Sequence, residues 1–227
     1  MPSPFTEIDS SGDLVLNITD EAYPSSAASY RVNADLLRVS SSYFKTLLDP
    51  TKFAEGIGVQ KTLESLGKRY RNPADAPASE LPTVRLDNVG RIGKVKDIRP
   101  LVTDFLRILH GMGLSSGHLT VPLSNLANLA IVADRFDALE PVRAYARKFN
   151  LFVGTQRRKS EAVAAIESYS EEKSRMRLLV AILLQHQPWF QDSATIIIKG
   201  SKRWAVLEDD VSELPLWWDL PNRIEGK

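Results

Sequence analysis

Histidines are the side chains of this sequence best suited to acid–base or metal chemistry, and there are three of them. His110 and His118 lie eight positions apart across a glycine-containing turn. A pair of histidines that holds a metal on a helix needs a spacing of about four residues. We therefore expect His110 near a helix end, His118 in a loop, and no metal site among them or His186.

The chain contains no cysteine. This excludes a disulfide framework, a thiolate zinc site and a cysteine nucleophile together. The absence of cysteine also fits a reducing compartment. Gly56-Ile57-Gly58 is the nearest approach to a phosphate-binding motif, but it follows a predicted helix instead of a strand, and no phosphate loop ends in Gly-Lys-Ser or Gly-Lys-Thr. We expect no catalytic residue and no cofactor, and the sequence favours a protein that is not an enzyme.

Three basic clusters could contact phosphate groups. They are Lys68, Arg69 and Arg71; then Arg91, Lys94, Lys96 and Arg99; then Arg157-Arg158-Lys159. A dedicated nucleic-acid binder usually carries a strong basic excess, whereas the net charge here is +1. We therefore expect solvated loops, with a short nuclear-import signal as the alternative for the third cluster. Contact with nucleic acid is disfavoured.

Four tryptophans gather in the last forty residues: Trp189, Trp204, Trp217 and Trp218. Clustered tryptophans more often form a small core between an extension and its domain than a ligand cage. We expect such a core here.

The composition is that of a globular protein, with 227 residues, 43% hydrophobic and 25% charged. The first eleven residues lack the basic-then-apolar pattern of a signal peptide. The longest apolar run, 178–184, is far shorter than the roughly 20 residues that span a bilayer. These features predict a soluble protein, cytoplasmic or nuclear, that does not enter a membrane.

The elements that must position these residues begin with short strands. Strands are predicted at 13–18, 29–32 and 83–86, and a pair of short helices, capped by Asn33 and a serine of 40–42, runs to Asp49-Pro50. Residues 56–82 are rich in glycine and proline and are interpreted as a long surface insertion, with one helical turn near 63–66.

Helices dominate the rest of the chain. Apolar residues at helical spacing predict helices over 97–112, 123–136, 139–149, 160–169 and 171–185. Residues 194–198 are mostly β-branched and predict a strand, which Gly200-Ser201 would join to 204–207 as a short hairpin. No internal repeat is present.

Three stretches in this order resemble a known family. The first stretch, residues 12–16 with 29–37 and 40–48, resembles the opening of a BTB/POZ domain. The second, 105–113, resembles the family's helix that ends in an aromatic residue and glycine, and the third, 126–136, resembles its Ala-Asp-aromatic helix. The resemblance covers about residues 12–150 and is closest to BTB-like proteins of filamentous fungi, whose Trp-rich Leu-Pro segment is similar to residues 217–221.

The resemblance implies an α+β fold of BTB/POZ type, a small three-stranded sheet flanked by a helical bundle. The BTB/POZ-like domain would comprise residues 12–150, with the insertion at 56–82. Residues 151–227 would form a helical extension with the hairpin and the Trp-rich tail, packed on the core.

The resemblance also implies a protein-interaction adaptor or scaffold, with protein-binding residues at Tyr43, Phe44, Phe53 and Glu55. In family members that recruit cullin scaffolds of ubiquitin ligases, a hydrophobic-x-Glu triplet stands about where Phe53-Ala54-Glu55 stands here. The simpler alternative is that Phe53 tucks under the helix pair and Glu55 is solvated. A chromatin- or transcription-associated factor that contacts nucleic acid through basic loops is the alternative function.

BTB domains that exchange strands as dimers usually carry a helix of about twenty residues before the first strand. Only residues 1–12 precede it here, and they show no helical period. We therefore expect no strand-swapped homodimer.

Overall fold

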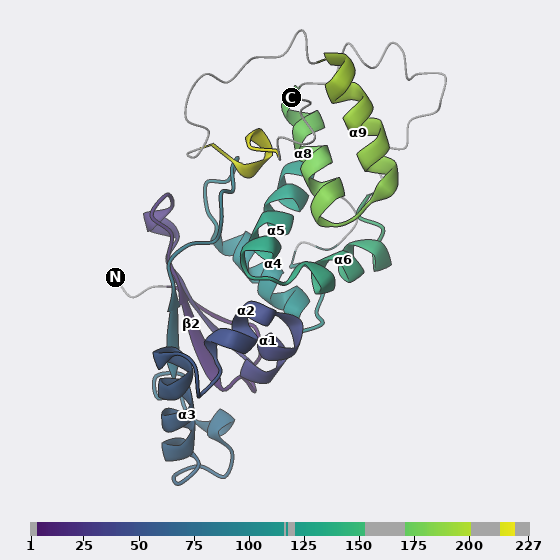
Figure 1. Cartoon of the computed structure of the whole chain (residues 1–227). Helices are drawn as coiled ribbons and strands as arrows, with labels where there is room; N and C mark the ends of the chain where they lie inside the picture. The colour runs from purple at the N-terminus through teal and green to yellow at the C-terminus, as the bar shows by residue number, and fades with distance from the viewer. Residues whose placement is uncertain (1–3, 116, 118–120, 153–170, 201–213, 221–227) are drawn as a thin grey trace.

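The computed structural model describes residues 4–115, 117, 121–152, 171–200 and 214–220 (Figure 1). Within these residues the chain is an α+β protein with a four-stranded mixed sheet and eight α-helices. The strands are β1 (Phe5–Glu7), β2 (Leu14–Ile18), β3 (Ala28–Val32) and β4 (Thr83–Leu86). The helices are α1 (Ala34–Ser40), α2 (Ser42–Leu47), α3 (Ala54–Leu66), α4 (Arg99–Leu109), α5 (Leu123–Arg135), α6 (Leu139–Lys148), α8 (Glu171–Leu183) and α9 (Gln187–Gly200). Short 3₁₀ turns lie at η1 (Pro24–Ser26), η2 (Pro73–Asp75) and η5 (Leu216–Trp218).

The sheet has the strand order β1-β3-β2-β4. β2 and β3 form an antiparallel hairpin in which Leu16 stands opposite Tyr30, and β4 runs parallel to β2 with Val84 beside Leu16. All three of these side chains are buried. Because side chains alternate between the two faces of a strand, this row lies on one face of the sheet, and that face covers the helical core.

The expectation of three strands is wrong for the described residues, because β1 adds a fourth. β1 runs parallel to β3, with Phe5 beside Ser29, and the Ser29 N–H donates to the Pro4 carbonyl at 2.9 Å. Three residues are too few to show a period of two, so this strand leaves no pattern in the sequence. Pairing with the edge of β3 gives it its extended structure.

The predicted helix pair is confirmed together with its caps. The Asn33 side chain accepts hydrogen bonds from the backbone N–H groups of Asp35 and Leu36 at the start of α1. The Ser41 side chain accepts from the Phe44 N–H at the start of α2. These side chains satisfy N–H groups that have no partner within the helix, which is why asparagine and serine mark helix starts so reliably.

The interpretation of 56–82 as an irregular insertion is wrong in its first part, because α3 occupies 54–66. The misleading residues are Gly56 and Gly58, which normally disfavour a helix. A Cβ at Gly56 would lie 2.2 Å from the Asp49 carbonyl oxygen, so a close contact between backbones requires glycine there. Leu66 at the end of α3 packs with Ala76 and Leu81 of the remaining stretch against Val15, on the opposite face of the sheet.

The described helices of the second half pack in series. α5 packs against α4 and α6, and α8 lies between α5 and α9. Figure 1 shows the sheet and α3 at one end of an elongated molecule, α4–α6 in the middle, and α8 and α9 at the other end. No helix among the described residues is both long and apolar enough to cross a membrane.

The predicted strand at 194–198 is wrong, because these residues lie within α9. Trp189, Ser193 and Ile197 are buried at four-residue spacing, so burial follows a helical period even though three isoleucines and a threonine favour strands. The hairpin at Gly200-Ser201 therefore lacks its first strand. Its second arm, 204–207, and the predicted helix at 160–169 lie outside the described residues.

Candidate functional site

The four residues predicted to bind a partner fall into two groups. Phe44 is fully buried and stacks on Phe136 with ring centroids 5.5 Å apart, and half-buried Tyr43 meets the same ring edge-on at 5.2 Å. The Ser41 hydroxyl donates to the Phe136 carbonyl at 2.6 Å. This aromatic group joins α2 to the helical core. Phe44 therefore has no surface to offer a partner, and it does not belong to the site.

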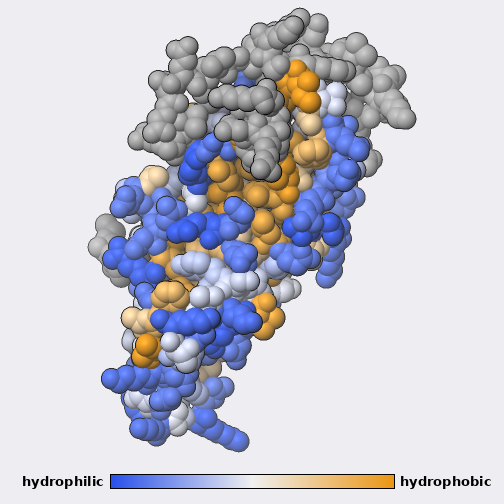
Figure 2. Space-filling model, viewed as in Figure 1, coloured by the Kyte–Doolittle hydropathy of each residue, from blue (hydrophilic) through white to orange (hydrophobic). Residues whose placement is uncertain are grey.

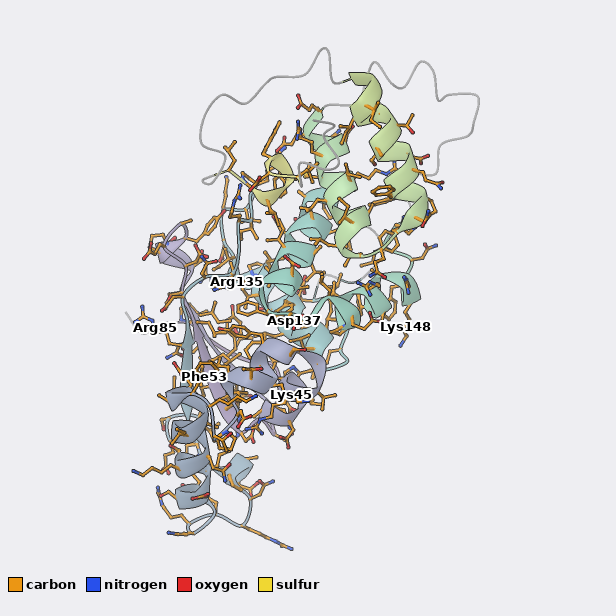
Figure 3. All side chains as sticks on the ribbon, in the orientation of Figure 1. Lys45, Phe53, Arg85, Arg135, Asp137 and Lys148 are labelled. Atoms are coloured by element: carbon orange, nitrogen blue, oxygen red, sulfur yellow. The ribbon has the colours of Figure 1, made fainter. Side chains whose placement is uncertain are left out.

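Phe53 and Glu55 lie at the start of α3 and are exposed. Phe53 is the residue before the helix, with extended backbone, and 47% of its surface is exposed. Glu55 stands in the first turn, where its negative charge complements the positive end of the helix dipole. The alternative in which Phe53 tucks under the helix pair is not what the structure shows (Figure 3).

Ile57 extends this surface and was missed at the sequence level. It lies four residues after Phe53, its N–H donates to the Phe53 carbonyl at 3.1 Å, and it is 52% exposed. This hydrogen bond places Ile57 one helical turn after Phe53, so two exposed apolar residues lie near each other at the start of α3. We call Phe53, Glu55 and Ile57 the α3 surface. The four-residue spacing would have revealed Ile57 had the helix been predicted.

The turn before α3 fixes where this surface lies. The Asp49 carboxylate accepts hydrogen bonds from the Thr51 N–H at 2.9 Å and the Thr51 hydroxyl at 2.6 Å, and it lies 3.5 Å from the Lys52 ammonium. These hydrogen bonds from Thr51 hold the pKa of Asp49 below its ordinary value. The start of α3 also lies close to the end of α2, because Gly56 meets the Asp49 carbonyl.

Other exposed apolar side chains of the described residues lie on β1, α1 and α9, among them Phe5 (47% exposed) and Ile198 (67% exposed). Val39 is 86% exposed and Leu36 39% exposed on α1, and Phe190 is 38% exposed on α9. In Figure 2 the lower part of the molecule shows small apolar areas separated by hydrophilic residues. Leu36 and Val39 lie three residues apart on α1 with the exposed Asp35 beside them, so they form a second apolar pair next to a carboxylate. What distinguishes the α3 surface is its place directly after the helix pair.

The histidines do not form a metal site among the described residues, where no three potential ligands meet. His110 is largely buried at the end of α4; its Nδ1 donates to the Leu106 carbonyl at 2.8 Å and its Nε2 accepts from the Asn33 N–H at 3.0 Å. Burial lowers the pKa of His110. His186 stacks on Phe152 at 4.0 Å, and His118 lies outside the described residues.

Residues 113–117 read Gly-Leu-Ser-Ser-Gly and match the Gly-x-Ser-x-Gly pattern of hydrolase nucleophile elbows, a match overlooked at the sequence level. An elbow places its serine between a strand and a helix, whereas this segment follows α4. The hydroxyl and the N–H of Ser115 both donate to the Asp104 carboxylate at 2.7 Å. This arrangement closes a turn and shows no imidazole that could activate the serine among the described residues.

An open cavity of about 230 Å³ lies between α4 and α5 and includes Asp97 and Asp104 in its wall. Hydrogen bonds from the Arg99 side chain hold the pKa of Asp97 at about 2, and Asp104 accepts the two bonds from Ser115. Both carboxylates are thus engaged with neighbouring residues. The lowered pKa of Asp97 is the opposite of the raised pKa that a general acid needs.

The second basic cluster is largely paired with carboxylates. Arg91 lies 2.6 Å from Asp219, Arg99 lies 2.6 Å from Asp97, and Lys94 contacts Glu172. In the first cluster Arg69 lies 2.8 Å from Glu80. The third cluster, 157–159, lies outside the described residues. These ion pairs reduce the positive charge available for phosphate groups.

The described tryptophans pack at two separate places. Trp189 is buried and meets Phe152 edge-on with ring centroids 5.3 Å apart. Trp217 is fully buried, and its indole N–H donates to Glu172 at 3.2 Å. Trp204 lies outside the described residues. Both buried rings nevertheless belong to the same continuous core, as the predicted tryptophan core requires, although their immediate neighbours differ.

Comparison with known proteins does not alter this picture. No family model, curated protein or solved structure matches the chain at a significant level.

Proposed function

We propose that this chain is a protein-interaction adaptor or scaffold of BTB/POZ type, without enzymatic activity, which links a partner to a cullin ubiquitin ligase. The order of the described elements supports the proposal. The hairpin β2–β3, the helix pair α1–α2, strand β4 and the helices α4–α6 follow one another as in the BTB/POZ plan that residues 12–150 resemble. A transcription-linked scaffold is a compatible role for the same fold.

The observation that carries the proposal is the exposed α3 surface. Phe53 and Ile57 present about half of their surfaces to solvent at the start of α3, and Glu55 stands beside them. Large apolar side chains at the centre of an interface contribute most of its binding energy once they leave water. A carboxylate beside them fixes orientation by pairing with a cation of the partner.

The rigid support of this surface favours binding. Gly56 lets α3 lie against the carbonyl of Asp49, so the α3 surface is already formed before a partner binds. A preformed surface loses less conformational entropy on binding than a flexible one. The segment therefore has the properties of a docking element.

The test is a binding titration with a purified cullin scaffold, using wild type, Phe53→Ala and Phe190→Ala. Phe190 is the matched control, because it is also an exposed phenylalanine but lies on α9. We expect Phe53→Ala to weaken binding at least about tenfold, or ~1.4 kcal/mol, and Phe190→Ala to leave it unchanged. The Tm of both variants should stay close to that of wild type.

A wild-type chain that binds no cullin would end the cullin part of the proposal. If Phe53→Ala and Phe190→Ala weakened cullin binding equally, the α3 surface would not be the binding site. The alternative of a nucleic-acid binder has less support, because Arg69, Arg91 and Lys94 are each held by a carboxylate.

A further inference from the structure

Residues 214–220, which we call the C-terminal segment, are held in part by a loop more than a hundred positions earlier in the sequence. Arg91 makes three of these contacts: its Nε donates to the Leu214 carbonyl at 2.9 Å, its carbonyl accepts from the Leu216 N–H at 2.8 Å, and its guanidinium lies 2.6 Å from the Asp219 carboxylate. One residue thus binds the backbone at two points and a side chain at a third.

The side chains of the C-terminal segment enter a fitted pocket. A Cβ at Gly93 would lie 2.4 Å from the Pro215 ring and 3.0 Å from the Trp217 ring, so both rings lie directly on the Gly93 backbone. The buried Trp217 indole donates to Glu172 at 3.2 Å, and the Arg175 guanidinium lies 5.3 Å from the Trp218 ring. We call Arg91, Gly93, Glu172 and Arg175 the cradle.

The loop that carries Arg91 and Gly93 is also held by residues outside the C-terminal segment. Asn128 is fully buried on α5 and makes two hydrogen bonds with the Gly93 backbone. Its side-chain oxygen accepts from the Gly93 N–H at 3.0 Å, and its side-chain amide donates to the Gly93 carbonyl at 2.7 Å. The Val89 N–H donates to Asp20 at 3.1 Å. Contacts outside the C-terminal segment therefore shape the loop that carries Arg91 and Gly93.

The C-terminal segment itself contributes little regular structure. It holds a single 3₁₀ turn, η5, and the thirteen residues 201–213 separate it from α9 in the sequence. Its recognition rests on a proline, a tryptophan two residues later and a carboxylate two residues after that, together with backbone hydrogen bonds. Short peptides that dock on folded domains are recognised by this combination of backbone bonds and side-chain pockets.

We propose that the cradle is a peptide-recognition site for a Pro-x-Trp-Trp-Asp segment of another polypeptide, and that residues 214–220 occupy it in cis as a displaceable internal ligand. Because the internal segment belongs to the same chain, its binding is intramolecular, so a partner peptide binds only when the internal segment is weakened or released. The site lies away from the α3 surface, at the opposite end of the molecule from α3 (Figure 1). It does not depend on the proposed function.

The first test uses the full chain with Trp217→Ala and a fluorescent peptide with the sequence of residues 212–222. Anisotropy should show saturable binding to this variant, at least about tenfold tighter than to wild type, whose cradle is filled. A peptide that carries alanine in place of Trp217 should not bind. Adding Gly93→Ala to the chain should abolish binding, because the new methyl group would occupy the position of the two rings.

Absence of binding to a folded Trp217→Ala chain would overturn the proposal, as would equal binding to the chain that also carries Gly93→Ala. Should Trp217→Ala fail to fold, the second test replaces it. A specific protease site inserted after residue 207 of the otherwise unchanged chain allows the C-terminal piece to be cut free. We expect the piece to stay bound after cleavage and to be released by excess unlabelled peptide. A piece that leaves only when the protein unfolds would show that it is part of the core and contradict the proposal.

Discussion

Phe44 and Phe53 lie nine positions apart, and their surroundings are opposite. Phe44 is enclosed by Phe136 and the helical core, whereas about half of the Phe53 surface meets solvent. We predict that Phe44→Ala lowers the free energy of unfolding by about 3–5 kcal/mol, because it leaves a cavity in the core. Phe53→Ala should change it by no more than about 0.5 kcal/mol. Urea unfolding followed by circular dichroism measures both, and a large loss for Phe53→Ala would show that this residue supports the fold.

His110 is a second residue whose contacts predict a measurable property. Its Nδ1 donates to the Leu106 carbonyl and its Nε2 accepts from the Asn33 N–H. Only the neutral imidazole has one donor and one acceptor nitrogen. Burial lowers the pKa of His110 below 6.5, against the opposing effects of the Leu106 bond and Asp9. At a pH between the lowered pKa of folded His110 and about 6.5, the unfolded chain therefore binds more protons than the folded chain. As the pH falls through this window, the free energy of unfolding must decrease.

The measurement compares wild type with His110→Gln in urea unfolding between pH 5 and pH 8. Glutamine offers an acceptor for the Asn33 N–H and does not titrate. We predict that wild type loses more stability than His110→Gln as the pH falls below about 6.5. Parallel pH profiles for the two proteins would mean that the pKa of His110 is the same in the folded and unfolded chains. His186→Gln serves as a separate comparison, since burial lowers the pKa of His186 too.

Among the helices and strands, those with local signals could be predicted and those fixed by distant contacts could not. Asn33 and Ser41 cap α1 and α2 through their own side chains, and the sequence shows them directly. Most of α3 was missed because its start contains Gly56, which the contact with Asp49 requires. Residues 194–198 of α9 were predicted as a strand because isoleucine and threonine favour strands, whereas packing makes them helical.

The same distinction applies to the candidate site. The family resemblance singled out Phe53 and Glu55. Ile57 could be recognised only once residues 54–66 were known to be helical, and the glycines of that stretch argued against a helix. Arg91 and the Trp-rich segment were each visible in the sequence, but their pairing was not, because Arg91 and Asp219 meet across 128 positions. Without aligned relatives, no local pattern indicates such a pair.

The two glycines near the start of α3 offer a matched pair of substitutions at the level of the helix. A Cβ at Gly58 would meet nothing within 4 Å, so we predict that Gly58→Ala raises the free energy of unfolding by up to about 1 kcal/mol through helix propensity. A Cβ at Gly56 would lie 2.2 Å from the Asp49 oxygen, and Gly56→Ala should lower the free energy of unfolding by about 1–3 kcal/mol. Chemical denaturation measures both, and equal effects of the two substitutions would contradict the close contact of α3 with the end of α2.

For the whole molecule, the important feature is that its two candidate interaction surfaces lie at opposite ends. The α3 surface lies beside the sheet, and the cradle lies beside α8, with the helices α4–α6 between them (Figure 1). Buried side chains from the sheet, from α4–α6, α8 and α9, and Trp217 belong to one continuous core. This arrangement suits a scaffold that contacts two partners without competition between them.

The most direct measurement of the central claim is hydrogen–deuterium exchange of the full chain with and without a purified cullin scaffold. The backbone N–H groups of α3 lie on a helix with exposed side chains, and a partner that covers Phe53 and Ile57 must slow their exchange. We predict slower exchange over residues 53–59, with residues 89–97 and 214–220 unchanged. Exchange over 53–59 that is identical with and without the cullin, in a sample where binding is established independently, would contradict the assignment of α3 as the docking surface.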